Sequence, residues 1–123
     1  KDRIVEKSVA KKQDAFRLAS VSFACASAKP EKKQDIVFEN IVEYLKQNPS
    51  ARIRLDGYAD KATGKERTNL MLSIRRTDSV RNILIERYGI APSRIDAQGI
   101  GCNAQPYEKN EHNRVVIVTA LPE

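Results

Sequence analysis

Residues 114–121, with the sequence RVVIVTAL, are the feature that most constrains the fold of this chain. Apolar side chains follow one another here, whereas a strand with one solvated face alternates apolar and polar positions. A strand that is apolar on both faces belongs in the interior of a sheet whose faces are covered. The segment therefore predicts a layered fold in which the last strand is internal.

Upstream of this strand, the chain alternates between strand-like and helix-like patterns. Charged and apolar residues alternate in residues 52–58, which predicts a half-covered strand. Apolar residues recur at helical spacing from Ile36 to Leu45. The predicted elements are, in order, a strand at 15–27, a helix that begins at Pro30 and stops at Asn48-Pro49, a strand at 52–58, a helix from Thr63 to Tyr88 that ends at Gly89, and strands at 95–100 and 114–121.

This order predicts an α/β (α+β) two-layer sandwich, βαβαββ, with two helices packed on one mixed sheet. A chain of 123 residues fits one domain. We expect residues 1–14 to be a polar, basic linker or arm and residues 15–123 to form the domain. The chain begins with Lys1, which suggests a mature or trimmed fragment, and no apolar run approaches the ~18 residues of a membrane span.

The predicted second helix carries polar side chains where an apolar stripe should continue. Asn69 and Arg76 stand seven residues apart. That spacing turns a helix by about 700°, so the two side chains point within roughly 20° of each other. Ser73 lies between them, and Val80 and Leu84 continue the same direction as an apolar stripe. A purely structural helix would be apolar along its whole inner face, so this pattern predicts a polar site.

Asp60 ends the strand that precedes this helix, and ligands of α/β sheets gather at the carboxyl ends of strands. Its carboxylate can bind an amine, while the planar fork of Arg76 matches a carboxylate. Asn69 offers a donor and an acceptor. Thr63 opens a capping-box pattern that ends at Glu66, and the helix start also favours a carboxylate. The set suits a zwitterionic amino-acid head group, although Asp60 and Arg76 could instead pair with each other.

The sequence lacks the residue patterns of a catalytic, metal or dinucleotide site. His112 is the only histidine and lies in a polar run, and Ser73 has no GxSxG context. The glycines of residues 99–101 are not followed by a helix, as a dinucleotide fingerprint requires. Cys25 and Cys102 form no CxxC or zinc spacing, and Cys25 is predicted to be buried in the first strand. We therefore expect no enzyme, no cofactor and no metal.

The net charge of +6 fits an anionic partner, such as nucleic acid, an acidic lipid surface or a wall polymer. The alternative function is accordingly a basic α/β module that binds nucleic acid or another protein. RNA-recognition modules stack bases on aromatic residues of their central strands. Residues 114–121 contain no aromatic residue, and the chain has no Trp. Nucleic acid is therefore not the expected partner.

Several motifs occur in the order and at nearly the spacing of a known family. The chain shows GYAD at 57–60, NLMLSIRRTDSV at 69–80, GIAPSRI at 89–95, GIG at 99–101 and NRVV at 113–116. Together these resemble the OmpA-like C-terminal domain, the peptidoglycan-binding module of outer-membrane proteins and lipoproteins. The short QPYEKN loop before NRV is similar to the variant found in outer-membrane proteins of the Bacteroides type.

The resemblance implies a βαβαββ domain that holds peptidoglycan noncovalently through the meso-diaminopimelate of its stem peptide. It implies that Asp60 and Arg76 act on the ammonium and carboxylate of that amino acid. The family's asparagine in the N-x-x-L-S-x-x-R motif falls on Asn69. The asparagine and first arginine of its N-R-R-V motif fall on Asn113 and Arg114. It further implies a domain on the periplasmic side of the outer membrane, which anchors an outer-membrane protein to the cell wall.

Overall fold

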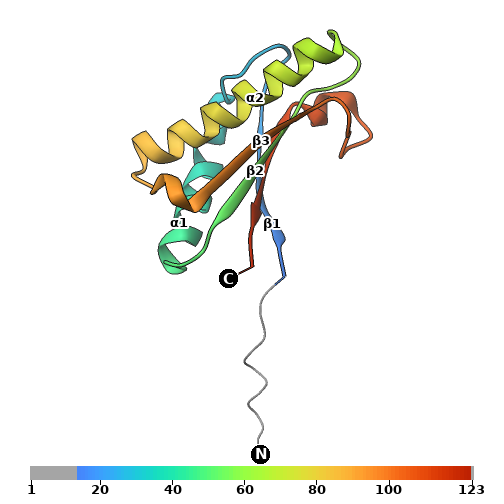
Figure 1. Cartoon of the computed structure of the whole chain (residues 1–123). Coiled ribbons are helices and arrows are strands. Elements are labelled where there is room, and N and C mark those ends of the chain that lie inside the picture. The colour runs from blue at the N-terminus through green and yellow to red at the C-terminus, as the bar shows by residue number, and fades with distance from the viewer. Residues whose placement is uncertain (1–13, 123) are drawn as a thin grey trace, which may run out of the picture.

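The structure is a computed structural model, and it describes residues 14–122. Most of the predicted arm at 1–14 therefore lies outside the described residues. Within them, four strands form one mixed sheet and two α-helices pack on it (Figure 1). The elements are β1 (Phe16–Ser22), α1 (Asp35–Gln47), β2 (Ile53–Tyr58), α2 (Glu66–Asn82), β3 (Ile95–Gly101) and β4 (Val115–Ala120).

The strand order in the sheet is β1-β4-β2-β3. Strand β4 pairs antiparallel with both β1 and β2, and β2 pairs parallel with β3. The two-layer sandwich and the internal last strand are thus confirmed. Within residues 14–122, no helix has the length and apolar character that crossing a membrane requires.

One apolar core joins both helices to the same face of the sheet. Leu55 of β2 pairs with Val118 of β4, and both are fully buried. Helix α1 contributes Phe38, Ile41 and Leu45 to this core, and α2 with its continuation contributes Val80 and Leu84. The apolar side chains predicted from helical and strand periodicity therefore pack together in one layer between the helices and the sheet.

Helix α2 lies unusually close to β2 and β3 because glycines face it. A Cβ atom added to Gly57 would lie 2.4 Å from the Ser73 carbonyl oxygen, and one added to Gly99 would lie 2.8 Å from the Ile74 nitrogen. Real Cβ atoms essentially never approach so closely. These two positions therefore seat the polar half of α2 directly over the ends of the two strands.

Gly57→Ala is expected to lower the free energy of unfolding by about 3 kcal/mol, because the new methyl group meets backbone that cannot yield without moving α2. Urea denaturation would measure the loss. Gly89→Ala is the matched control: a Cβ there meets nothing within 4 Å and bears only the strain of φ 72°, about 1 kcal/mol. Equal losses for the two variants would contradict the close approach of α2.

The predicted second helix differs from the structure at its start and in the form of its last turn. It begins at Glu66, with Lys65 as its N-cap residue and no capping side chain, so the predicted capping box at Thr63 is wrong. At the other end, the chain continues as a π-helical turn (Ile83–Arg87), and Gly89 follows with a φ of 72°. This left-handed residue confirms the predicted C-terminal glycine.

The first predicted strand is too long. Strand β1 ends at Ser22, and residues 24–29 form a loop in which Cys25 is exposed, so its predicted burial is wrong. Pro30 forms an isolated bridge with Phe23 and does not begin a helix. Helix α1 begins only at Asp35. The small residues of this segment favour a strand locally, but long-range hydrogen bonds described below hold them as a loop.

Candidate functional site

A small pocket of about 110 Å³ lies at the carboxyl end of β2, where the predicted site residues gather. The loop after β1, the loop after β2 and the first turns of α2 enclose it. It brings together four of the predicted residues, Asp60, Thr63, Asn69 and Arg76. Its remaining lining residues are Cys25, Ala26, Ala59, Gly64 and Leu72.

Arg76 is the buried cation of this pocket, with a relative exposure of 1%. Its Nε, Nη1 and Nη2 atoms donate to the backbone carbonyls of Ser27 (2.8 Å), Tyr58 (2.9 Å) and Ala24 (3.1 Å). The guanidinium also lies over the Phe23 ring, with Cζ 5.2 Å from the ring centroid. Arg76 thus ties the loop after β1 to the end of β2, which explains why residues 24–29 leave the sheet.

The charge of Arg76 is not neutralised by contact with an acid, since no carboxylate of the described residues forms an ion pair with it. The direct Asp60–Arg76 pair that the sequence left open is not formed. Each Nη atom of Arg76 carries a further N–H beyond the one it donates to a carbonyl. Burial lowers the pKa of Arg76 to about 10, against the opposing effect of the Asp60 charge, so the group stays protonated at neutral pH.

Asp60 is the buried anion of the pocket and is held from two sides. Its Oδ1 atom accepts hydrogen bonds from the amides of Ala62 and Thr63 at 3.1 Å each, and from the Thr63 hydroxyl at 3.0 Å. Its Oδ2 atom pairs with Nε of Arg114 at 2.8 Å. Thr63 therefore fixes the carboxylate and does not cap the helix.

The hydrogen bonds of Asp60 also set its charge. Burial raises the pKa of Asp60, but the hydrogen bonds from Arg114 and Thr63 outweigh that effect, and the pKa falls below its ordinary value. The same contact raises the pKa of Arg114. Asp60 is therefore ionised at neutral pH, and its Oδ2 atom has a lone pair left for a second donor.

Asn69 holds the loop that follows β2. Its Nδ2 atom donates to the carbonyls of Thr63 (2.9 Å) and Asp60 (3.3 Å), and its side chain is buried. No described residue donates to its Oδ1 atom. Asn69 thus shapes the loop that follows Asp60 and leaves a carbonyl oxygen in the pocket wall.

Ser73 and Asn113, two other predicted residues, do not line the pocket. The Ser73 hydroxyl accepts a hydrogen bond from the Gly101 amide at 2.9 Å and donates to the Leu70 carbonyl at 2.7 Å. Asn113 holds the preceding loop, since its Oδ1 accepts from the Tyr107 amide and its Nδ2 donates to the Tyr107 carbonyl, each at 2.9 Å. Both are buried and support the site from outside the cavity.

Gln105 is a supporting residue that the sequence reasoning missed. Its Nε2 atom donates to the Ala59 carbonyl at 2.9 Å, and its Oε1 atom accepts from the Lys61 amide at 3.2 Å and from Asn113 Nδ2 at 3.0 Å. It thereby fixes the chain on both sides of Asp60. Gln105 is the first residue of the QPYEKN loop, but it follows no strand or helix period, so its contacts with the chain around Asp60 were not predicted.

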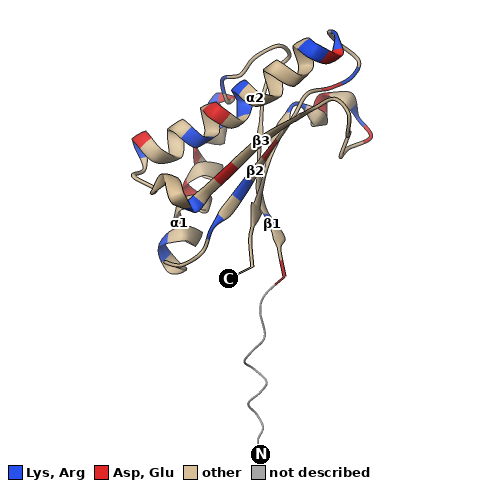
Figure 2. Ribbon diagram, viewed as in Figure 1, with Lys and Arg blue, Asp and Glu red and all other residues tan. Residues whose placement is uncertain are grey.

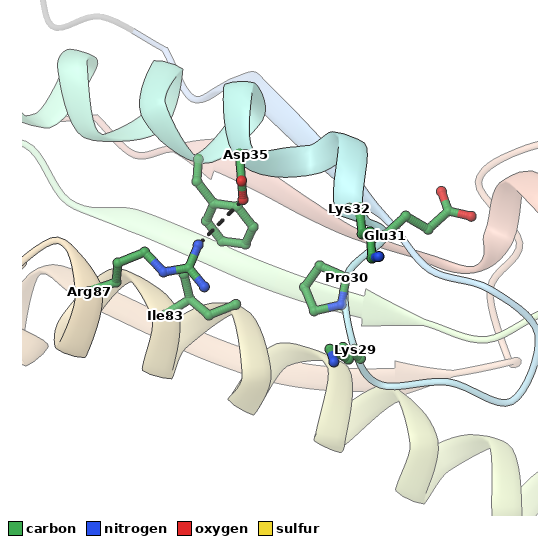
Figure 3. A pocket seen from close by; sticks show the side chains of 8 residues that line it. Lys29, Pro30, Glu31, Lys32, Asp35, Ile83 and Arg87 are labelled. Atoms are coloured by element: carbon green, nitrogen blue, oxygen red, sulfur yellow. Dashed lines mark hydrogen bonds and ion pairs between the residues drawn. The ribbon is translucent and has the colours of Figure 1, made fainter.

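A larger hollow of about 500 Å³ lies between the start of α1 and the π-helical turn after α2 (Figure 3). Arg87 and Asp35 face each other across it, with Nη1 and Oδ1 3.4 Å apart (Figure 3). Their side chains are 55% and 71% exposed, so solvent screens the pair. None of the predicted site residues lines this hollow. The candidate site is therefore distinguished by its buried charges and not by its size.

The described residues contain no group of His, Cys, Asp and Glu side chains arranged to hold a metal ion. Both cysteines are free. Lys and Arg positions are distributed along helices, strands and loops together with Asp and Glu positions (Figure 2). The buried charged residues that line the pocket are Asp60 and Arg76.

The OmpA family model matches residues 22–116. Outer membrane protein 40 of Porphyromonas gingivalis is 42% identical over 100 residues, which cover 81% of this chain and 26% of that protein. Peptidoglycan-binding protein ArfA of Mycobacterium tuberculosis is 34% identical over 88 residues, which cover 67% of this chain and 26% of that protein. The chain thus spans about a quarter of the length of these relatives.

Among solved structures, the peptidoglycan-associated lipoprotein from Burkholderia pseudomallei has the same fold. Its TM-score is 0.76 at 22% sequence identity, and the match covers 83% of this chain and 89% of that chain. The family match spans β2, α2 and β3, and it includes all the residues that line the pocket. The chain belongs to the OmpA family.

Proposed function

We propose that this domain binds peptidoglycan noncovalently by holding the meso-diaminopimelate of the stem peptide. The observation that carries the proposal is the separation of two buried, ionised groups that line one pocket. Asp60 is paired with Arg114, while Arg76 has only backbone carbonyls and the Phe23 ring around its charge. A ligand with both a carboxylate and an ammonium group complements this arrangement.

The donors and acceptors of the pocket that have no partner among the described residues indicate which side chain would bind each end of the ligand. The remaining N–H groups of Arg76 would bind the carboxylate, since a guanidinium matches a carboxylate in plane. The Oδ2 atom of Asp60 and the Oδ1 atom of Asn69 would accept hydrogen bonds from the ammonium. A cavity of about 110 Å³ has room for the head group of one amino acid. No bond is made or broken, so the function is binding and not catalysis.

The family membership supports the same function at a coarser level. Relatives are named as outer-membrane proteins and as a peptidoglycan-binding protein, and the structural neighbour is a peptidoglycan-associated lipoprotein. We infer that the domain lies on the periplasmic side of the outer membrane and anchors its parent protein to the wall. Many copies on one polymer would raise a modest affinity by avidity.

Free meso-diaminopimelate is expected to displace the domain from purified peptidoglycan, because it presents the same zwitterion to Asp60 and Arg76. Co-sedimentation with increasing amounts of the amino acid would measure the displacement. Peptidoglycan with lysine in place of diaminopimelate is the matched control, since lysine lacks the second carboxylate, and it should retain about tenfold less protein.

The same assay distinguishes this function from general attraction to polyanions. Attraction through the net charge of +6 would weaken steeply with added salt, and DNA would compete. We expect DNA to leave the sedimented fraction unchanged. Competition by DNA as effective as that of diaminopimelate, with no preference between the two peptidoglycans, would favour a nonspecific basic module.

A further inference from the structure

Strand β3 forms an open edge of the sheet. The strand order ends at β3, and within residues 14–122 no strand pairs with its outer side. An edge strand presents unpaired N–H and C=O groups there, which proteins commonly protect with Lys, Pro or a bulge. The sequence of β3, IDAQGIG, has no Lys and no Pro. The register of β3 against β2 is irregular only near its end, where Gly57 pairs with Gly99 and Tyr58 pairs with Gly101, so residues 95–99 form the regular part of this edge.

Apolar side chains of α2 lie over this edge. The helix is seated on glycines of β3, since a Cβ at Gly99 would meet Cγ1 of Ile74 at 2.5 Å and one at Gly101 would meet the Leu70 Cα at 3.2 Å. Leu70 and Ile74 are nevertheless 40% and 37% exposed. They touch the last strand of the sheet and have no strand beyond it to cover them. We call the outer edge of β3, together with Leu70, Ile74 and Ile100, the β3 ledge.

The β3 ledge continues into a hollow of about 490 Å³ between the start of α2 and the end of β3. Leu70, Ile100 and Gly101 give this hollow apolar walls, and Lys65, Arg67 and the single acid Glu66 also line it. It shares no lining residue with the pocket of Asp60 and Arg76. A partner could therefore occupy the ledge while the pocket is filled.

We propose that the β3 ledge binds an extended segment of a partner protein, which adds to the sheet as a fifth strand. The open edge would supply backbone hydrogen bonds, as in other complexes formed by strand addition. Alternate side chains of an added strand face the helix layer, so apolar residues at alternate positions would cover Leu70 and Ile74. An acidic residue at the end of the segment would meet Lys65 and Arg67.

The charge of the chain favours such a partner over a second copy of the domain. Two copies joined at this edge would each bring a net charge of +6. Net charges of the same sign oppose association. An acidic, apolar segment has the complementary charge and the complementary side-chain period. This inference concerns a surface apart from the proposed wall-binding pocket.

Fluorescence anisotropy with a labelled peptide, Val-Thr-Val-Thr-Val-Asp-Glu, would test the proposal on the whole 123-residue chain. We expect saturable binding, with affinity at least about tenfold lower for a peptide ending in Lys-Lys. A peptide with Pro in place of the central Val should also bind at least about tenfold more weakly, because it cannot complete the added strand. Hydrogen exchange of β3 amides should slow when the first peptide is bound.

The double variant Leu70→Lys, Ile74→Lys should bind the peptide at least about tenfold more weakly, since it removes apolar contact and adds positive charge. Both side chains are exposed, so circular dichroism and co-sedimentation with peptidoglycan should stay unchanged. Absence of saturable binding, or equal binding of the Pro-containing peptide, would overturn the proposal. A dimer in sedimentation equilibrium that the double variant abolishes would overturn it in favour of a second copy.

Discussion

Arg76→Met is expected to lower the free energy of unfolding by about 3 kcal/mol and to abolish co-sedimentation with peptidoglycan. The substitution leaves the carbonyls of Ala24, Ser27 and Tyr58 without their donor, and each orphaned buried group costs about 1 kcal/mol or more. It also removes the cation that lies over Phe23. Chemical denaturation would measure the stability, and sedimentation with purified peptidoglycan would measure the binding.

Two further variants separate the two roles of Arg76. Arg75→Met is the matched control, because Arg75 is the adjacent residue of α2 and is exposed. It should change stability by less than about 0.5 kcal/mol. Arg76→Lys keeps the charge but lacks the planar fork, so it should remain folded at low temperature and bind the wall weakly. Full binding by a folded Arg76→Lys variant would contradict a bidentate grip on a carboxylate.

Asp60→Asn is expected to reduce binding to peptidoglycan by at least about tenfold and to cost about 2 kcal/mol of stability. The change removes the charge that faces the ligand's ammonium, and it replaces the ion pair with Arg114 by a hydrogen bond to an uncharged amide. The amide keeps the size of the carboxylate, so the pocket is not enlarged. Asp78→Asn on the exposed side of α2 is the control and should behave as the parent protein.

Because the pKa of Asp60 is lowered, the loss of stability in Asp60→Asn should depend on pH. A carboxyl group with a depressed folded-state pKa stabilises the fold above its unfolded pKa of about 3.9, and this contribution is lost as the pH falls through the folded-state pKa. The parent domain should therefore lose stability below about pH 4. The stability difference between parent and Asp60→Asn should shrink over the same range. A difference that stays constant down to pH 2 would show that the charge of Asp60 does not stabilise the fold.

The pocket keeps its two charges apart at some cost to stability. A buried cation without a contacting acid is unfavourable, and the lowered pKa of Arg76 is the sign of that cost. The carboxylate cannot relieve it, because Oδ1 of Asp60 is held by the loop amides and Thr63, and Oδ2 by Arg114. An anionic ligand would repay the cost on binding. This arrangement favours a site for a ligand over a purely structural ion pair.

Residues 14–122 offer no clear surface for the nucleic-acid partner that the sequence left as an alternative. The internal strand β4 has no aromatic side chain, so the sheet offers no stacking surface of the RNA-recognition type there. The basic residues are spread over the fold (Figure 2). The two features that stand out are a charged pocket at the end of β2 and an open edge at β3. They lie on different parts of the domain and call for different partners.

The sequence by itself determined the elements whose side chains follow a local period. Alternation predicted β2, continuous apolar residues predicted the internal position of β4, and Gly89 predicted the end of the second helix. The seven-residue spacing of Asn69 and Arg76 also placed both side chains in one pocket with Asp60. These features depend on residues close together in the chain, so their geometry follows from strand and helix periodicity.

Only the tertiary structure decided which groups these side chains contact. Asp60 pairs with Arg114, which is 54 positions away in the sequence. Arg76 instead donates to backbone carbonyls of the loop after β1, such as that of Ala24, which is 52 positions away. These hydrogen bonds hold residues 24–29 as a loop, although their sequence predicts a strand. Cys25 and Ala26 of this loop line the pocket, and Cys25 is exposed. Such contacts carry no local period, because a hydrogen bond between distant segments is set by how the layers pack and by which buried groups still need partners.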